Sequence, residues 1–385
     1  MIARMCLSDL HLGDPRSELS DPAASARVAA RLAEVSGGEV GTLVLNGDVW
    51  DECVPANPEV LRGGLAASVL DASRAFFENL LGRIRVGRVV YVPGNHDLSL
   101  WSWYCRNVLA VPDSCTPYAG MEVDPSNWPW RDLFGSTGVD HLCAAYPLFW
   151  DKSAGPGYPL LAFTHGHLLD PLVRGSSPEV EYDALRVLGC VRPDTSAGAG
   201  GPLSVRMLAR RVEPFCLALW ARYSSRDYDL SNYVMRRLLS PQSCGLDPGS
   251  GAVPDGADQP PPDQGLLAQV PWFLDLMLAD PSLPSPVGTL GRGLASFGKG
   301  SARPAGDPET SCLVYGHDHL AARQDLSVDA IPFRAVGSGG WTSERDGHRP
   351  HTHVLVWEAE SDVVPTSYRV ETRETGSGDG QRSSR

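Results

Sequence analysis

No stretch of roughly 18 consecutive apolar residues occurs in the sequence, so no segment has the length to span a membrane as a helix. The first residues, MIARMCLSDLHLG, also lack the apolar core of a signal peptide, because Asp9 and His11 interrupt them early. We therefore expect a cytoplasmic protein without a transmembrane segment, whose contact with membranes is at most peripheral.

Cysteine motifs are absent as well. The nine cysteines are scattered and odd in number, and no C-x-x-C pair occurs, which argues against a zinc ribbon or a thioredoxin-type redox site. This usage suits a reducing cytoplasm better than a disulfide framework. The motif G-x-S-x-G of serine hydrolases is missing too, so the sequence indicates no protein nucleophile of that kind.

The sequence also lacks an excess of positive charge. The formal net charge is −13, and an acidic surface repels phosphate backbones, so we do not expect a nucleic-acid partner. Hydrophobic residues make up 42% and charged residues 21%, which is the ordinary balance of a globular protein with a sizeable core. The length of 385 residues predicts one large domain with an insertion, or two domains.

Short apolar runs alternate with helical patterns through the first hundred residues. We predict strands at 1–7, 42–45 and 88–92, and helices at 22–36 and 58–82. The first helix follows Asp21, an N-cap candidate, and begins with proline. Further strands are predicted at 158–164, 311–315, 330–336, 353–357 and 363–370. This alternation predicts a layered α/β fold with parallel strand pairs, in which ligands collect at the carboxyl ends of the strands.

The stretch between the strands at 158–164 and 311–315 is far too long for an ordinary connection. We therefore divide the chain into a main domain of residues 1–169 and 306–370, an inserted helical cap of residues 170–305, and a disordered tail of residues 371–385. Within the cap, helices are predicted at 179–190, 203–240 and 264–279, around a flexible Pro/Gly-rich middle at 241–263.

Two features of the predicted cap each have two interpretations. The arginines either form a solvated helix face or clamp substrate phosphates; they are Arg206, Arg210, Arg211, Arg236 and Arg237. The apolar stretch at 271–278 either packs on the main domain or touches a membrane surface.

Polar motifs follow five of the predicted strands. They are Asp9-x-His11, Gly47-Asp48-x-x-Asp51, Gly94-Asn95-His96-Asp97, His165-Gly166-His167 and Gly316-His317-x-His319. Imidazole and carboxylate ligands together suit Mn, Fe, Zn or Co better than Ca or Mg. Side chains two apart on an extended segment point the same way, so one loop can present two ligands to a site. Two metals about 3.5–4 Å apart need a shared ligand, and a carboxylate such as that of Asp48 is the natural bridge.

These five motifs, in this order, resemble those of the calcineurin-like metallophosphoesterase superfamily. The resemblance implies a four-layer α/β/β/α sandwich and two divalent metal ions, Mn²⁺ foremost, with Fe, Zn or Co as alternatives. It implies that the first metal is held by Asp9, His11, Asp48 and His319, and the second by Asp48, Asn95, His165 and His317. It further implies that His96 is catalytic and stabilises or protonates the leaving oxygen, and that Asp97 orients His96.

Within the superfamily, the sequence is most similar to the subgroup of UDP-2,3-diacylglucosamine pyrophosphatase-like enzymes, which also insert a helical cap between the fourth and fifth motifs. That subgroup reads His-Gly-Asp where this chain has His165-Gly166-His167, and the insertion here is much larger. The segment 336–341, Val-Gly-Ser-Gly-Gly-Trp, resembles another family stretch but lacks its asparagine. We therefore expect a relative of that subgroup with a different or modified substrate.

The resemblance implies hydrolysis of a phosphomonoester, phosphodiester or pyrophosphate by a hydroxide that bridges two metals, with His96 aiding the leaving group. The expected substrate is a small phosphorylated molecule, with nucleotide-linked or lipid-linked pyrophosphates included. A nuclease of the same superfamily is one alternative, against which the acidic balance argues. A non-catalytic scaffold that binds partner proteins is another, against which the complete ligand set argues. Two roles stay open: Asp51 contacts His96, contacts a ligand or forms a salt bridge, and His167 supports a ligand or contacts substrate.

Overall fold

A computed structural model describes residues 1–51, 65–97, 100–101, 104, 108, 118–135, 139–146, 148–151, 161–167, 311–317, 319, 321–328, 331–342 and 352–372. Within these residues the chain is mixed α/β, with two mixed sheets and few helices, which confirms the predicted α/β class. The predicted cap helices, the Pro/Gly-rich middle and residues 373–385 of the predicted tail lie outside the described residues. None of the described helices combines the length and the apolar character needed to cross a membrane.

The predicted alternation of strands and helices is present at the N-terminus. The elements are β1 (Ile2–Leu7), the 3-10 turn η1 (Glu18–Ser20), α1 (Pro22–Ser36), β2 (Glu39–Asn46), α2 (Ala67–Leu81) and β3 (Arg85–Val92). Helix α1 begins where predicted, because the carboxylate of Asp21 accepts hydrogen bonds from two backbone N–H groups of the first turn. It ends at Gly37, whose φ of 63° is the left-handed conformation that glycine adopts without strain.

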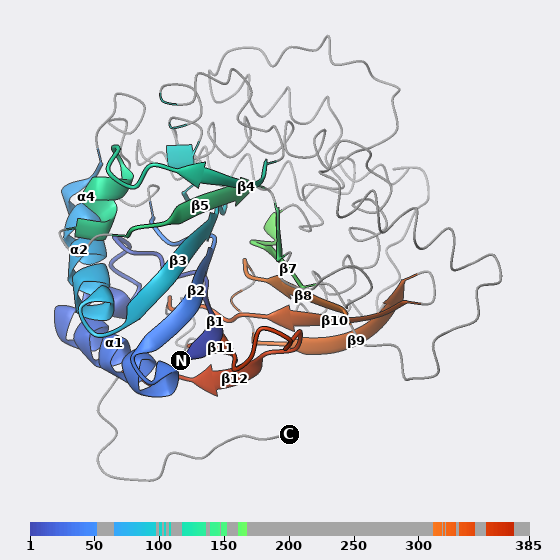
Figure 1. The fold of residues 1–385 in the computed structure, drawn as a ribbon. Helices are drawn as coiled ribbons and strands as arrows, with labels where there is room; N and C mark the ends of the chain where they lie inside the picture. The colour runs from blue at the N-terminus through green and yellow to red at the C-terminus, as the bar shows by residue number, and fades with distance from the viewer. Residues whose placement is uncertain are drawn as a thin grey trace, which may run out of the picture.

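Strands β1, β2 and β3 form the centre of a seven-stranded sheet with the order β12-β11-β1-β2-β3-β5-β4. The other members are β4 (Tyr118–Val123), β5 (Leu142–Tyr146), β11 (His353–Trp357) and β12 (Thr366–Arg369). Strands β1, β2, β3 and β5 run parallel, whereas β11, β12 and β4 pair antiparallel towards the two edges. Helices α1, α2 and α4 (Trp130–Phe134) lie along one face of this sheet (Figure 1).

The second sheet has five strands in the order β6-β7-β8-β10-β9. They are β6 (Leu148–Asp151), β7 (Leu161–Thr164), β8 (Ser311–Tyr315), β9 (Arg323–Val328) and β10 (Ile331–Gly337). The central strands β7, β8 and β10 run parallel, and β6 and β9 are antiparallel edges. Because β7 and β8 are neighbours, the fourth and fifth polar motifs are brought together although they are far apart in the chain.

Alternating side chains bury both faces of the central strands. In β2, Leu43 and Leu45 belong to the apolar cluster beneath the helices, whereas Val44 belongs to the cluster between the two sheets. In that second cluster, the ring of Phe163 in β7 meets the ring of Trp357 in β11, with centroids 5.4 Å apart. The described residues thus form three layers, namely helices, the seven-stranded sheet and the five-stranded sheet.

Strands β4, β5, β6 and β9 and helix α4 were not predicted from the sequence pattern. Strand β5 reads Leu-Cys-Ala-Ala-Tyr, whose alanines have a weak strand preference; its pairing with β3 and β4 forms the strand. The predicted strands at 42–45 and 88–92 are longer in the structure, since hydrogen-bonded pairing continues beyond the apolar runs into β2 and β3. The helix predicted at 58–82 begins at Ala67 in the described part of the chain.

Candidate metal centre

The five polar motifs meet at the carboxyl ends of five strands. The residues near these ends are Asp9 after β1, Asp48 after β2, Asn95 after β3, His165 after β7 and His317 after β8. Backbone hydrogen bonds hold the loops together: Asp9 N–H donates to the carbonyl of Gly47 at 3.0 Å, and Gly316 N–H donates to the carbonyl of His165 at 2.8 Å. The convergence of polar side chains predicted from the strand pattern is therefore present.

The first group of side chains comprises Asp9, His11 and His319. Their candidate ligand atoms lie within 4.8 Å of one another. Nε2 of His319 is 3.4 Å from Oδ1 of Asp9 and 3.1 Å from Nε2 of His11. Two imidazole nitrogens at that separation need a proton or a cation between them, because their lone pairs otherwise repel. The first group thus has the arrangement of a cation position.

The second group comprises Asp48, His165 and His317, whose ligand atoms again lie within 4.8 Å of one another. Asn95 joins it, since its Oδ1 is 3.1 Å from Nε2 of His165. Oδ2 of Asp48 is 3.1 Å from Nε2 of His165 and 3.8 Å from Nε2 of His11. The carboxylate of Asp48 therefore lies between the two groups, where a ligand shared by two metals has to be.

The Nδ1 atoms of His11, His165 and His319 are anchored by the protein. Nδ1 of His11 is 3.0 Å from the carboxylate of Asp51, Nδ1 of His319 is 2.8 Å from Oγ1 of Thr342, and Nδ1 of His165 is 3.2 Å from the carbonyl of Asn46. A carboxylate and a carbonyl can only accept, so His11 and His165 carry a proton on Nδ1 and direct Nε2 towards the cluster. This is the usual arrangement of histidines that bind metals.

Charge and burial keep the candidate ligands in protonation states that can bind a metal. Burial lowers the pKa of His165, and burial together with the nearby His11 lowers the pKa of His319, so both imidazoles are neutral. Burial alone would raise the pKa of Asp48, but its interactions with His165 and with the protonated ring of His96 outweigh burial and hold that pKa well below its usual value. Neutral imidazoles and ionised carboxylates form a donor set that fits Mn, Fe, Zn or Co.

The backbone of the ligand loops is in a conformation that side chains normally avoid. Among the described residues, the non-glycine residues with positive φ are Asp9 (54°), His11 (47°), Asp48 (49°), His317 (76°) and His319 (57°). All five are predicted metal ligands. The left-handed conformation costs roughly 1–2 kcal/mol per residue, and such strain gathers at functional sites.

The glycine before Asn95 is needed because Asp48 fills the adjacent space. A Cβ atom on Gly94 would overlap the carboxylate and backbone nitrogen of Asp48. The neighbouring His96 N–H donates to Oδ1 of Asp48 at 2.8 Å, which leaves Oδ2 directed towards the two ligand groups. The motif Gly94-Asn95-His96 thus holds the shared carboxylate in place as well as supplying side chains.

His96 lies at the open side of the cluster, with 18% of its side chain exposed. Its Nδ1 is 3.0 Å from Oδ2 of Asp51, the same oxygen that contacts His11, and its Nε2 is 4.0 Å from Oδ2 of Asp48. Burial opposes the charged imidazole, but the carboxylates of Asp51 and Asp48 raise the pKa of His96 to about 10. The ring therefore carries a proton at neutral pH. The contacts of Asp51 fit all three roles left open for it, because it contacts the candidate ligand His11 and also forms a salt bridge with the protonated ring of His96.

The hydrogen bonds of Asp97 join the backbones of two candidate ligand loops. Its Oδ1 accepts a hydrogen bond from Gly94 N–H at 2.6 Å, and its Oδ2 accepts one from Val49 N–H at 3.0 Å. Burial and the charge of Asp48 raise the pKa of Asp97 to about 7. Asp97 therefore ties two ligand loops together through their backbones, whereas Asp51 makes the hydrogen bond that orients the ring of His96.

His167 lies behind the cluster rather than at its open side. Its side chain is 2% exposed, its ring centroid is 5.5 Å from that of His165, and its Nε2 is 3.3 Å from the hydroxyl of Tyr146. Burial and the neighbouring His165 hold the pKa of His167 well below its usual value. Of its two predicted roles, this position favours support of the ligand loop over contact with substrate.

Two of the groups that anchor the imidazoles, Thr342 and Asn46, were not predicted from the sequence. Thr342 follows the Gly-rich stretch that ends at Trp341, and Asn46 is the last residue of β2. Asn46 also donates from Nδ2 to the carbonyl of Thr164 at 2.9 Å, which joins the two sheets beside the centre. Their only signal in the sequence is adjacency to a motif, which does not specify the contact.

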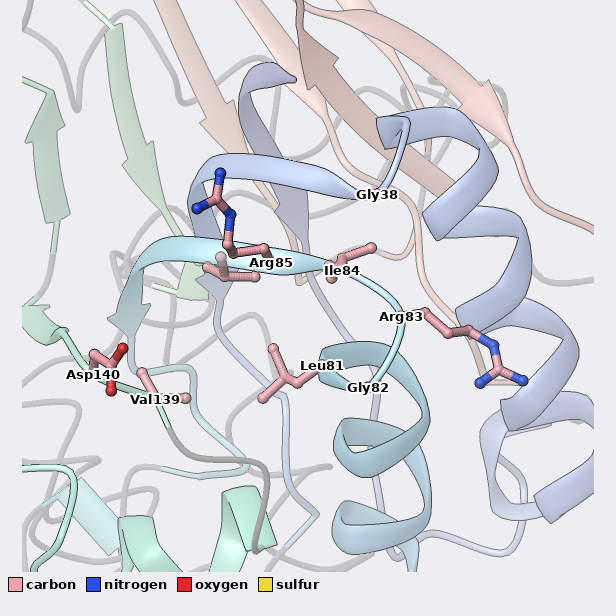
Figure 2. Close-up of a pocket in the computed structure, with 9 residues that line it drawn as sticks. Gly38, Leu81, Gly82, Arg83, Ile84, Arg85, Val139 and Asp140 are labelled. Atoms are coloured by element: carbon pink, nitrogen blue, oxygen red, sulfur yellow. The ribbon is translucent and has the colours of Figure 1, made fainter.

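A cavity of about 450 Å³ lies at the opposite ends of the same strands, where β2 and β3 begin (Figure 2). Gly38, Ile84 and Arg85 line it, together with Val139 and Asp140, and no histidine does. It is therefore separate from the candidate metal centre. A scan against protein-family models and a search of curated proteins found no match to this chain.

Proposed function

We propose that the chain is a phosphoesterase that depends on two divalent metal ions and belongs to the calcineurin-like metallophosphoesterase superfamily, with that superfamily's four-layer α/β/β/α sandwich. One observation carries the proposal. The carboxylate of Asp48 lies between two groups of ligands, 3.1 Å from His165 of one group and 3.8 Å from His11 of the other. Neither a buried salt bridge nor a helix cap would bring two such groups to one carboxylate.

The two ligand groups match the two expected metal positions. Asp9, His11, Asp48 and His319 would hold the first ion, and Asp48, Asn95, His165 and His317 the second. When bound, such a pair of ions supplies positive charge for phosphoryl oxygens and a water of lowered pKa. The anchored Nδ1 atoms of His11 and His165 support this assignment, because they leave both Nε2 lone pairs free for a metal.

His96 would serve as the general acid. It is protonated and partly exposed, and the hydrogen bond from its Nδ1 to Asp51 directs Nε2 towards the cluster. A proton on Nε2 can pass to the oxygen of the leaving group as its bond to phosphorus breaks. General acids of this kind contribute about 10²–10⁴ to the rate. Asp51 would act by orienting His96, and Asp97 by holding the loops.

The proposed substrate is a small phosphomonoester, phosphodiester or pyrophosphate. Among pyrophosphates, nucleotide-linked and lipid-linked molecules are favoured by the similarity of the motifs to UDP-2,3-diacylglucosamine pyrophosphatase-like enzymes. The net charge of −13 disfavours a nucleic-acid substrate, because counter-ion release contributes most of the affinity for phosphate backbones.

The test is a metal titration followed by a substrate panel. Protein stripped with chelator should take up two equivalents of Mn²⁺ and then hydrolyse p-nitrophenyl phosphate, bis-p-nitrophenyl phosphate or a UDP-sugar pyrophosphate. A nicked plasmid would indicate the nuclease alternative, and uptake of metal without any turnover would favour the scaffold. His353→Ala is the control for loss of a histidine outside the candidate centre, because His353 lies on β11 and its Nδ1 contacts Ser367. This variant should bind Mn²⁺ and turn over substrate like the unsubstituted protein. The absence of stoichiometric uptake would refute the proposal.

A further inference from the structure

The segment that follows β10 runs past the first group of ligands. Ser338 N–H donates to the carbonyl of Tyr315 at 2.9 Å, and Trp341 N–H donates to the carbonyl of Asp9 at 3.2 Å. Thr342 continues the segment and forms an isolated bridge with Ser17. The segment is therefore fixed both to β8, the strand that precedes the fifth motif, and to the loop that carries the first motif.

Gly340 and Thr342 of this segment form a cradle for the ring of His319. A Cβ atom on Gly340 would lie 2.7 Å from Cγ of His319, which is closer than real Cβ atoms approach, so the imidazole packs directly against the glycine. Oγ1 of Thr342 is 2.8 Å from Nδ1 of His319, and Thr342 is buried. The cradle thus fixes both the place of the ring and the partner of one nitrogen.

The partner of Nδ1 decides which nitrogen of His319 faces the ligand group. Nε2 of His319 points towards Asp9 and His11, at 3.4 and 3.1 Å. For Nε2 to offer its lone pair there, Nδ1 must carry the proton, and the hydroxyl of Thr342 must accept it.

The partner of Nδ1 in His319 differs from the partners of Nδ1 in His11 and His165. The partners of His11 and His165 can only accept, whereas a hydroxyl can also donate. His319 is also the most exposed of the three, with 24% of its side chain accessible against 3% and 0%. Its orientation therefore depends most on the cradle.

We infer that Gly340 and Thr342 are positioning residues that hold the ring of His319 with Nε2 directed at the first metal position and thereby set the affinity of that position alone. The inference rests on the proposed function for the identity of the ligand, a divalent metal ion. It concerns residues 340 and 342, which belong to none of the five motifs and touch no reacting atom. Removal of the hydroxyl should act on one of the two metal positions.

Calorimetric titration of chelator-treated protein with Mn²⁺ tests this effect. Thr342→Val keeps the shape of the side chain but loses the hydroxyl, and we expect about 10–100-fold weaker binding of one equivalent, with the other unchanged. Thr342→Ser should restore both equivalents, and Gly340→Ala should mimic the valine variant by displacing the ring. Thr352→Val is the matched control, because Thr352 is another buried threonine whose hydroxyl donates to a backbone carbonyl, that of Val370.

A second measurement separates this inference from the proposed function. Long-range ¹⁵N–¹H correlation spectra of protein labelled with ¹⁵N-histidine and loaded with diamagnetic Zn²⁺ report which ring nitrogen of His319 binds the ion, and His319→Gln assigns its signals. We expect a Zn²⁺-bound Nε2 and a protonated Nδ1 in the unsubstituted protein and in Thr342→Ser. In Thr342→Val, the Zn²⁺-bound signal of His319 should weaken while that of His165 stays. Unchanged signals and unchanged affinities in Thr342→Val would overturn the inference while leaving the phosphoesterase proposal standing, whereas the absence of any Zn²⁺-dependent change in the histidine signals would refute the proposed function.

Discussion

Polar side chains are buried at the carboxyl ends of strands β2 and β3 but exposed to solvent at their amino ends. At the carboxyl ends, Asp48 is 1% exposed and Asn95 is 8% exposed, and both lie among buried imidazoles. At the amino ends, Arg85 forms an ion pair with Glu39 while 81% of its side chain stays in solvent. Desolvated charges require compensation from a partner, whereas solvent compensates exposed ones. The difference supports the proposed metal centre at the carboxyl ends of the strands.

The backbone conformation also differs between the two ends of β2. Before β2, the chain turns through positive φ at Gly37 and Gly38, where glycine adopts the conformation without strain. After β2, the chain again has positive φ, at Gly47 and then at Asp48, which keeps a carboxylate in a conformation unfavourable for it. Such strain gathers at functional sites, which agrees with the proposed role of Asp48 as a metal ligand.

The largest effect is expected from removal of the shared carboxylate. Asp48→Ala should abolish tight binding of both Mn²⁺ equivalents, because Asp48 contacts both ligand groups. Metal at 100 times its Kd stabilises a folded protein by about 2.7 kcal/mol per site, so the rise in Tm that Mn²⁺ gives the unsubstituted protein should disappear. Elemental analysis and thermal unfolding with and without Mn²⁺ measure both. Loss of only one equivalent would contradict the bridging position.

His96→Ala should separate catalysis from metal binding. We expect kcat to fall by about 10²–10⁴ because the leaving oxygen loses its proton donor, while two equivalents of Mn²⁺ still bind. Steady-state kinetics and elemental analysis of the same preparation give the two values. His353→Ala provides the control for loss of an imidazole elsewhere, and turnover equal to that of the unsubstituted protein in His96→Ala would refute the assigned role.

Glycine and alanine variants of two ligands test the strain directly. In metal-free protein, His319→Gly should be more stable than His319→Ala by roughly 1–2 kcal/mol, because residue 319 has a φ of 57°. At His165, which is not among the residues with positive φ, the order should reverse by about 0.5–1 kcal/mol. Urea denaturation with chelator present measures all four variants. The same order at both positions would contradict the strain argument.

The sequence predicts the strands and the polar motifs at their carboxyl ends better than it predicts the side chains that orient those motifs. Strands β1, β2, β3, β7 and β8 are runs of apolar residues followed by polar motifs, so both the strands and the meeting of the motifs follow from local pattern. The carboxylate that orients His96 does not, since Asp97 is its neighbour in sequence while Asp51 reaches the ring across the fold. The roles of Thr342 and Asn46 could not be predicted either, because their contacts with the candidate ligands depend on tertiary packing.

The smallest effect is expected at the amino ends of the strands. Arg85→Ala removes an exposed ion pair with Glu39, and such pairs contribute less than about 1 kcal/mol because water screens the charges. We expect urea denaturation to detect a change of at most about 0.5 kcal/mol, with Mn²⁺ uptake and turnover unaltered. A substantial loss of turnover in this variant would mean that the cavity beside Arg85 takes part in function, and the contrast between the two ends of the sheet would no longer hold (Figure 2).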